Sequence, residues 1–212
     1  LIVKYLRDSD SMPLRVDYDA FTTADKQALE GYLRHLAAVE ITKYNRDQQI
    51  AFWMNLYNAS IVNMVLDSLP VNSVLQIRGP GLNVVGPWLK PIAEISGQTL
   101  SFNDVEHYIL RPYFNDMGPL VHYGLNCASM GCPSLAPRAH TAENWRDNLS
   151  ATARMYVNSP HGVRFEDGEL YTSKIYDSWF MDDFGGSAES SIAHLMRYAE
   201  PELAERLANH DT

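Results

Sequence analysis

The sequence predicts a single α+β domain with a buried central helix, several packed helices and a small, mainly antiparallel sheet. Three observations lead to this class: helical periodicity recurs along the chain, short hairpin signals interrupt it, and no change of composition marks a linker. The 212 residues are 46% hydrophobic and 20% charged, which is typical of a packed globular protein and excludes a disordered chain. We therefore expect residues 1–212 to form one domain.

Two helices are predicted in the first 69 residues of the chain. Thr22 offers a cap ahead of an apolar stripe that ends near Val39. A second helix is expected over residues 47–69, and Pro70 ends it. The apolar residues of this second helix lie nearly all around it, so we expect it to be the buried central helix.

The middle of the chain alternates loops with short elements. Residues 79–91 are rich in Gly and Pro and predict a loop, and residues 92–100 predict a hairpin. Ser101 and Asp104 have the spacing of a capping box. We expect them to open a short helix that Pro112 closes.

The next elements include the strongest hairpin signal of the chain. Residues 120–126 alternate weakly and predict a strand, and residues 127–137 predict an irregular loop. An amphipathic helix is expected over residues 141–157. Asp167-Gly168 sits at the centre of a predicted hairpin over residues 163–172.

The negative charge is concentrated near the C-terminus. The chain has 26 acidic and 17 basic side chains, and residues 165–212 hold 11 of the acids and 3 of the bases. The last helix is expected from about residue 188, with an interruption at Pro201, so we expect a solvated, acidic helical segment from about residue 186. A cation site is the alternative interpretation of three carboxylates, Asp177, Asp182 and Asp183, although the alternating spacing of a calcium loop is missing.

Composition also restricts the partners. A net charge of −9 argues against nucleic acid and anionic membrane surfaces, because both bind clustered Lys and Arg. No run of about 18 apolar residues is present, so we expect no membrane span. The expected partner is therefore a small molecule or a peptide. We predict no cofactor. The sequence does not indicate an oligomeric state.

Polar residues in the central helix need partners. Asn55 and Asn58 lie among apolar neighbours, and a buried amide without a partner costs about 1–3 kcal/mol. The two amides either bond neighbouring loop backbone and fix the fold, or one of them orients a catalytic base or stabilises an oxyanion.

His107 and Arg111 lie on one face of the helix predicted after Ser101. Apolar residues form a second face of the same helix, so we expect the helix to be sandwiched and both side chains to lie against protein. His107 is then either an acid or base in a site or a structural histidine.

The densest group of reactive residues is His122, Cys127 and Cys132. Strand alternation would place His122 and Cys127 on opposite faces, which weakens a local dyad, although His107 could supply the base instead. The cysteines lack a second pair and the spacing of a zinc site. They either form a disulfide across a turn eased by Gly131 or include a reactive thiol.

Several short sequence motifs, taken together, resemble one family, Domain of Unknown Function 547. The resemblance runs from about Val16 to about Gly185 and is carried by ordered motifs: Phe52-Trp53-Met54-Asn55-Leu56-Tyr57-Asn58-Ala59; Val105-Glu106-His107 with Leu110-Arg111; His122, Leu125 and Cys127; Cys132-Pro133; Leu170-Tyr171 with Ser173; and Asp183-Phe184. The family has no assigned function. Ser134 stands where the family usually has a second Pro, and Gly124 stands where Ala is common.

The resemblance also has implications for location. Many bacterial members are exported, which implies a periplasmic or extracellular setting and favours oxidised cysteines. The chain starts at Leu1 rather than Met, so we expect a processed or trimmed end. Plant relatives attach the domain to coiled-coil regions, which implies that some members act in assemblies.

Two hypotheses follow. The first is a thiol-dependent hydrolase or transferase, with papain-like or transglutaminase-like chemistry on a small peptide or acyl substrate. Its expected catalytic residues are Cys127, Cys132, His107, His122 and Asn55, and its expected substrate-binding residues are Arg111, Asn58, Glu106, Trp53 and Tyr57. The alternative is a non-catalytic binding or envelope-maintenance module with a structural disulfide.

Overall fold

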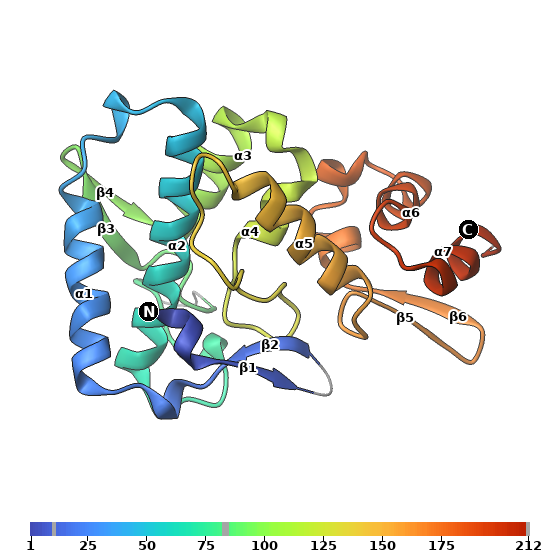
Figure 1. Cartoon of the computed structure of the whole chain (residues 1–212), viewed down its shortest axis with the longest axis horizontal. Coiled ribbons are helices and arrows are strands. Elements are labelled where there is room, and N and C mark those ends of the chain that lie inside the picture. The colour runs from blue at the N-terminus through green and yellow to red at the C-terminus, as the bar shows by residue number, and fades with distance from the viewer. Residues whose placement is uncertain (10–11, 82–84, 211–212) are drawn as a thin grey trace.

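The computed structural model describes residues 1–9, 12–81 and 85–210. It confirms an α+β fold in which helices predominate (Figure 1). In the described ranges the strands form three separate two-stranded antiparallel hairpins and not one small sheet. Each strand has only four or five residues, and the hairpins pack beside helices: β3 contacts α1, and β2 contacts α5.

The elements of the fold have these bounds. The helices are α1 Thr23–Ala37, α2 Arg46–Ser68, α3 Arg111–Tyr113, α4 Val121–Gly124, α5 Trp145–Val157, α6 Ala188–Met196 and α7 Pro201–Ala208. The strands are β1 Leu6–Ser9, β2 Met12–Val16, β3 Pro91–Ile95, β4 Gln98–Ser101, β5 Val163–Glu166 and β6 Glu169–Thr172. Short 3₁₀ segments are η1 Ile2–Tyr5, η2 Tyr18–Ala20, η3 Ile41–Lys43, η4 Val74–Gln76, η6 Asn115–Leu120 and η8 Met181–Phe184, and two π-helical segments are η5 Asp104–Leu110 and η7 Ile175–Trp179.

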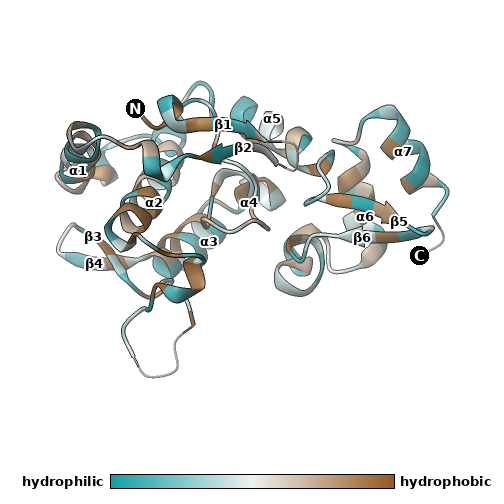
Figure 2. Cartoon of the chain, turned by 90° about the horizontal axis from the view of Figure 1, so that it is seen from below, coloured by the Kyte–Doolittle hydropathy of each residue, from teal (hydrophilic) through white to brown (hydrophobic). Residues whose placement is uncertain are grey.

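The first core is built around α2. Asn45 caps this helix with Gln48 in a reciprocal capping box, which satisfies backbone groups that the first turn leaves free. Ile50 and Ile61 have no exposed surface, and hydrophobic residues recur on several sides of α2 (Figure 2). The prediction of a buried central helix is confirmed, and so is the cap of α1, where the Thr22 side chain accepts the backbone N–H of Asp25.

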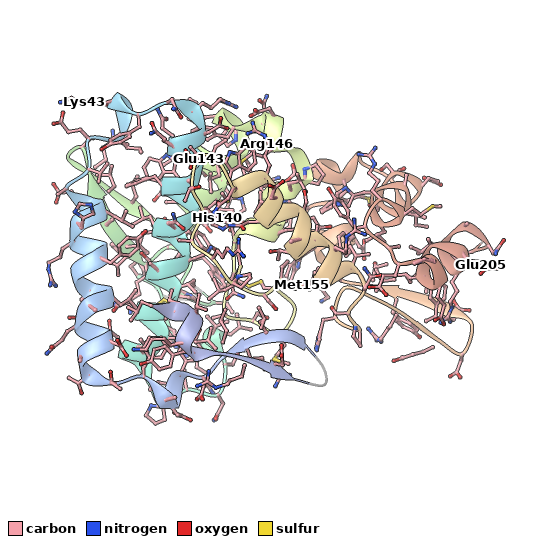
Figure 3. The ribbon with its side chains drawn as sticks, in the orientation of Figure 1. Lys43, His140, Glu143, Arg146, Met155 and Glu205 are labelled. Carbon is pink, nitrogen blue, oxygen red and sulfur yellow. A yellow bond between two sulfur atoms is a disulfide. The ribbon has the colours of Figure 1, made fainter. Side chains whose placement is uncertain are left out.

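A second core lies at the other end of the molecule, among α5, α6, α7, η7 and η8. Its buried members include Tyr123, Tyr156, Tyr176 and Leu195. Figure 2 shows α6, α7 and the β5–β6 hairpin grouped together, away from α1 and α2. Glu205 lies on the surface of α7 (Figure 3) and is exposed, which agrees with a solvated acidic segment.

The strand predicted over residues 120–126 is wrong, because Val121–Gly124 form helix α4. All four residues of α4 are buried, so the alternation of their hydrophobicity carries no information about a solvent face. Gly124 allows a close approach here: a Cβ atom would lie 2.6 Å from the Met54 sulfur and 2.8 Å from Leu149 Cδ2. With any larger residue at this position, these two side chains would have to shift.

Other boundaries differ in smaller ways. Pro112 does not close the helix after Ser101, because helical backbone continues through Tyr113. The capping box itself is confirmed, since Ser101 and Asp104 exchange hydrogen bonds. The hairpin of β1 and β2 was not predicted. The predicted hairpins over residues 92–100 and 163–172 are both present.

Candidate functional site

A pocket of about 660 Å³ lies between the two cores. We call it the histidine pocket, because His107 and His122 both line it. Its walls come from α2, η4, η5, α4, η7 and residues 127–132, which we call the cysteine loop. Segments far apart in the sequence therefore meet here, and the walls are mostly apolar.

His122 on α4 is a deeply buried histidine in the wall of this pocket. Its Nε2 atom lies 2.7 Å from Asp183 Oδ2 on η8, and only 2% of its side chain is exposed. A carboxylate only accepts, so Nε2 donates and Nδ1 is left as the acceptor when the ring is neutral. The ring also stacks on Phe180 with 4.1 Å between centroids. This arrangement fixes the ring and leaves its second nitrogen able to accept a proton.

Asp183 has two hydrogen-bond donors. Arg111 Nε donates to the same oxygen at 2.7 Å. Burial by itself would raise the pKa of the Asp183 carboxyl, but the hydrogen bonds from His122 and Arg111 together hold that pKa well below its ordinary value. The carboxylate therefore stays ionised at neutral pH and fixes the orientation of the His122 ring.

His107 on the π-helical segment η5 is bonded by a cation, whereas His122 is bonded by a carboxylate. Arg111 Nη1 lies 3.0 Å from His107 Nδ1, and a guanidinium only donates, so Nδ1 accepts and Nε2 carries the proton of the neutral ring. Arg111 itself bounds a smaller hollow with Asp183 and does not line the histidine pocket. Arg111 influences the pocket only through its hydrogen bonds to His107 and Asp183.

Tyr57 and Glu106 form a further polar pair of the pocket wall. The Tyr57 hydroxyl donates to Glu106 Oε2 at 3.1 Å. Burial, followed by the negative charge of Glu106, raises the pKa of Tyr57 well above its ordinary value. Tyr57 therefore remains a hydrogen-bond donor at any physiological pH.

Asn55 and Asn58 of α2 bond the backbone of other segments and do not line the histidine pocket. Asn55 donates to the His140 carbonyl at 2.8 Å and accepts the His140 N–H at 3.0 Å. Figure 3 shows His140 beside α2. Asn58 donates to the Gly124 carbonyl at 2.7 Å and accepts the Asn126 N–H at 3.0 Å. These contacts favour the structural interpretation of both amides over a role as oxyanion donor.

Trp53 also lies outside the histidine pocket. It is buried in the first core and packs edge-to-face on Phe52. Of the residues expected to bind substrate, Tyr57 and Glu106 line the histidine pocket, whereas Trp53, Asn58 and Arg111 do not.

Cys127 and Cys132 form a disulfide, and their Cα atoms are 6.1 Å apart. Neither residue is therefore a thiol in this state, so of the two alternatives that the sequence left open the structure has the disulfide. Both residues line the histidine pocket together with His122. The expectation that His122 and Cys127 point apart is wrong, because it rested on a strand where the chain forms α4.

Sequence reasoning missed the partner of His122. The sequence indicates Asp183 as a possible cation ligand and as part of a family motif, and it gives Phe180 no role. The motif Asp183-Phe184 was the available signal, but nothing in the local pattern connects it to α4. Among the described residues no cluster of three or more His, Cys, Asp or Glu is placed to hold a metal ion.

The fold and site thus define an α+β domain with a pocket between two cores and an Asp–His pair in its wall. The family model described as Protein of unknown function, DUF547, matches residues 41–157, and the chain belongs to this family. The matched range includes His107, His122 and both cysteines, whereas Asp183 lies beyond it. No curated protein and no solved structure matches the chain. No helix in the described part of the chain is long and apolar enough to cross a bilayer.

Proposed function

We propose that the chain is a hydrolase that cleaves a small acyl or peptide substrate in the histidine pocket, with His122 as the general base. The observation that supports this most is the 2.7 Å hydrogen bond from buried His122 Nε2 to Asp183. It holds the ring in one tautomer and leaves Nδ1 to accept a proton. A base fixed by a carboxylate in a pocket wall is the usual arrangement in acyl transfer.

The chemistry balances with water as the nucleophile. His122 Nδ1 takes a proton from a water molecule whose oxygen attacks the substrate carbonyl carbon. His107 Nε2–H donates to the developing oxyanion, because Arg111 occupies the other ring nitrogen. The imidazolium of His122 then returns its proton to the leaving oxygen or nitrogen.

The walls of the pocket favour a substrate with an apolar part. Leu75, Met130 and Trp179 line the pocket and are 52%, 48% and 55% exposed. Large apolar side chains exposed around a concave site mark a binding surface. The thiol-dependent form of the hydrolase would need the disulfide to be reduced first.

The test uses p-nitrophenyl esters and dipeptide p-nitroanilides as substrates. We expect His122→Gln to lower kcat/KM by about 10²–10⁴-fold, and Asp183→Asn to lower it similarly because the ring loses its tautomer. His35→Gln, an exposed histidine of α1, is the matched control. Circular dichroism and the unfolding temperature show whether each variant folds. Equal turnover by wild type and folded His122→Gln would refute the proposal.

A second candidate is a non-catalytic binding or envelope-maintenance module. The disulfide in the pocket wall favours it, because a closed loop keeps a binding surface rigid. It predicts ligand binding by calorimetry with no turnover above buffer. For both candidates we propose a periplasmic or extracellular setting, supported by the disulfide and by the family resemblance.

A further inference from the structure

The disulfide of the cysteine loop lies where a bound ligand can reach it. Both of its residues line the histidine pocket. Cys132 is 7% exposed, whereas Cys127 is only partly buried. We therefore expect an incoming nucleophile in the pocket to reach Cys127 before Cys132.

Hydrogen bonds hold the cysteine loop independently of the disulfide. The Asn126 amide donates to the Pro133 carbonyl at 2.7 Å, and this bond joins the two ends of the loop. The same side chain accepts the Ala128 N–H at 2.9 Å. From outside the loop, the Tyr156 hydroxyl donates to the Gly131 carbonyl at 2.6 Å. These hydrogen bonds thus hold the two ends of the loop together at the place where the disulfide also joins them. A disulfide that spans so few residues restrains the unfolded chain only a little.

The pocket that both cysteines line also supplies a proton acceptor. His122 lines the same pocket, and its Nε2–H is engaged by Asp183. Its Nδ1 can therefore take the proton of a thiol, and the thiolate is the species that attacks a disulfide.

We propose that Cys127–Cys132 is an exchangeable disulfide that oxidises a dithiol bound in the histidine pocket. His122 deprotonates the first substrate thiol, and its thiolate attacks Cys127 Sγ. The Cys127–Cys132 bond breaks, and Cys132 leaves as a thiolate that takes a proton. The second substrate thiol then attacks the substrate sulfur of the mixed disulfide and releases Cys127. Two substrate thiols become one disulfide, and the protein disulfide becomes two thiols. This activity is additional to the proposed hydrolysis and needs no acyl substrate.

The experiment uses the oxidised full chain under argon, mixed with dihydrolipoamide or with a reduced peptide that carries two cysteines. After an acid quench, N-ethylmaleimide labelling and intact mass count the protein thiols. We expect two labelled cysteines in folded protein, with a reduced form whose unfolding temperature stays within a few degrees of the oxidised one. Reaction with the small dithiol alone, or with the peptide, identifies the source of the thiols. A disulfide that survives excess dithiol until urea unfolds the chain would overturn the proposal.

Single-cysteine variants test the order of attack. We expect Cys132→Ser to form a mixed disulfide with the oxidised peptide about tenfold faster than Cys127→Ser does, because the free thiolate must be reachable from the pocket. His122→Gln should slow the exchange of wild-type protein at neutral pH, and His35→Gln should not. Equal rates for the two cysteine variants would refute the assignment of Cys127. Exchange without ester or anilide turnover would refute the hydrolase alone, and turnover without exchange would refute the exchangeable disulfide alone.

Discussion

Replacing Asn58 by Ala tests whether this residue maintains the fold or takes part in catalysis. Asn58 is 8% exposed and bonds the Gly124 carbonyl and the Asn126 N–H. Ala lacks the side-chain amide, so the Gly124 carbonyl and the Asn126 N–H both lose their hydrogen bond to this residue. An unsatisfied buried polar group costs about 1–3 kcal/mol, so we expect the free energy of unfolding to fall by about 2–6 kcal/mol.

Urea unfolding followed by tryptophan fluorescence measures this change. Asn55→Ala is the matched comparison, because Asn55 makes the same pair of bonds to His140. Asn58→Asp keeps the acceptor for Asn126 and replaces the donor by an oxygen that faces the Gly124 carbonyl. We expect Asn58→Asp to be unstable at pH 7 and to recover partly at low pH, where the carboxyl is protonated and can donate again.

One result would refute this reasoning. If Asn58→Ala unfolds within about 0.5 kcal/mol of wild type but loses turnover or binding, the amide is an orienting group and not a support of the loop. The stability assay and the activity assay therefore separate the two interpretations that the sequence left open.

Two further predictions concern stability. Burial lowers the pKa of both His140 and His194 from 6.5 to about 4. Between these two values the unfolded chain binds more protons than the folded chain does. The free energy of unfolding should therefore fall as the pH drops from about 6.5 to about 4, by at most about 3 kcal/mol for each residue. Unfolding temperatures at pH 7 and pH 5 measure this, and an unchanged temperature would contradict it. Gly124→Ala should lower the free energy of unfolding by about 1–3 kcal/mol, because the added Cβ would collide with Met54 and Leu149. If the variant has the same urea midpoint as wild type, α4 can move without penalty.

Local patterns predicted the parts of the fold that depend on local physics. The all-round hydrophobicity of α2, the cap at Thr22 and the turn at Asp167-Gly168 each act within a few residues, and each prediction is confirmed. The π-helical segments η5 and η7 were not predicted, because a short stretch of wider helix leaves no mark in the periodicity. Helix α4 was misread for a related reason: burial on every side removes the contrast on which a pattern depends.

The candidate site was predictable only in part, because its central interaction joins two distant segments. His122 and Asp183 are 61 positions apart along the chain. Asp183 also lies outside the residues 41–157 that match the family model. Without it, the His122 ring would lose the acceptor that fixes its tautomer, and Arg111 would lose the carboxylate that it pairs with. The matched range therefore contains His107, His122 and both cysteines, but the segment from η7 to η8 supplies the carboxylate that orients the His122 ring.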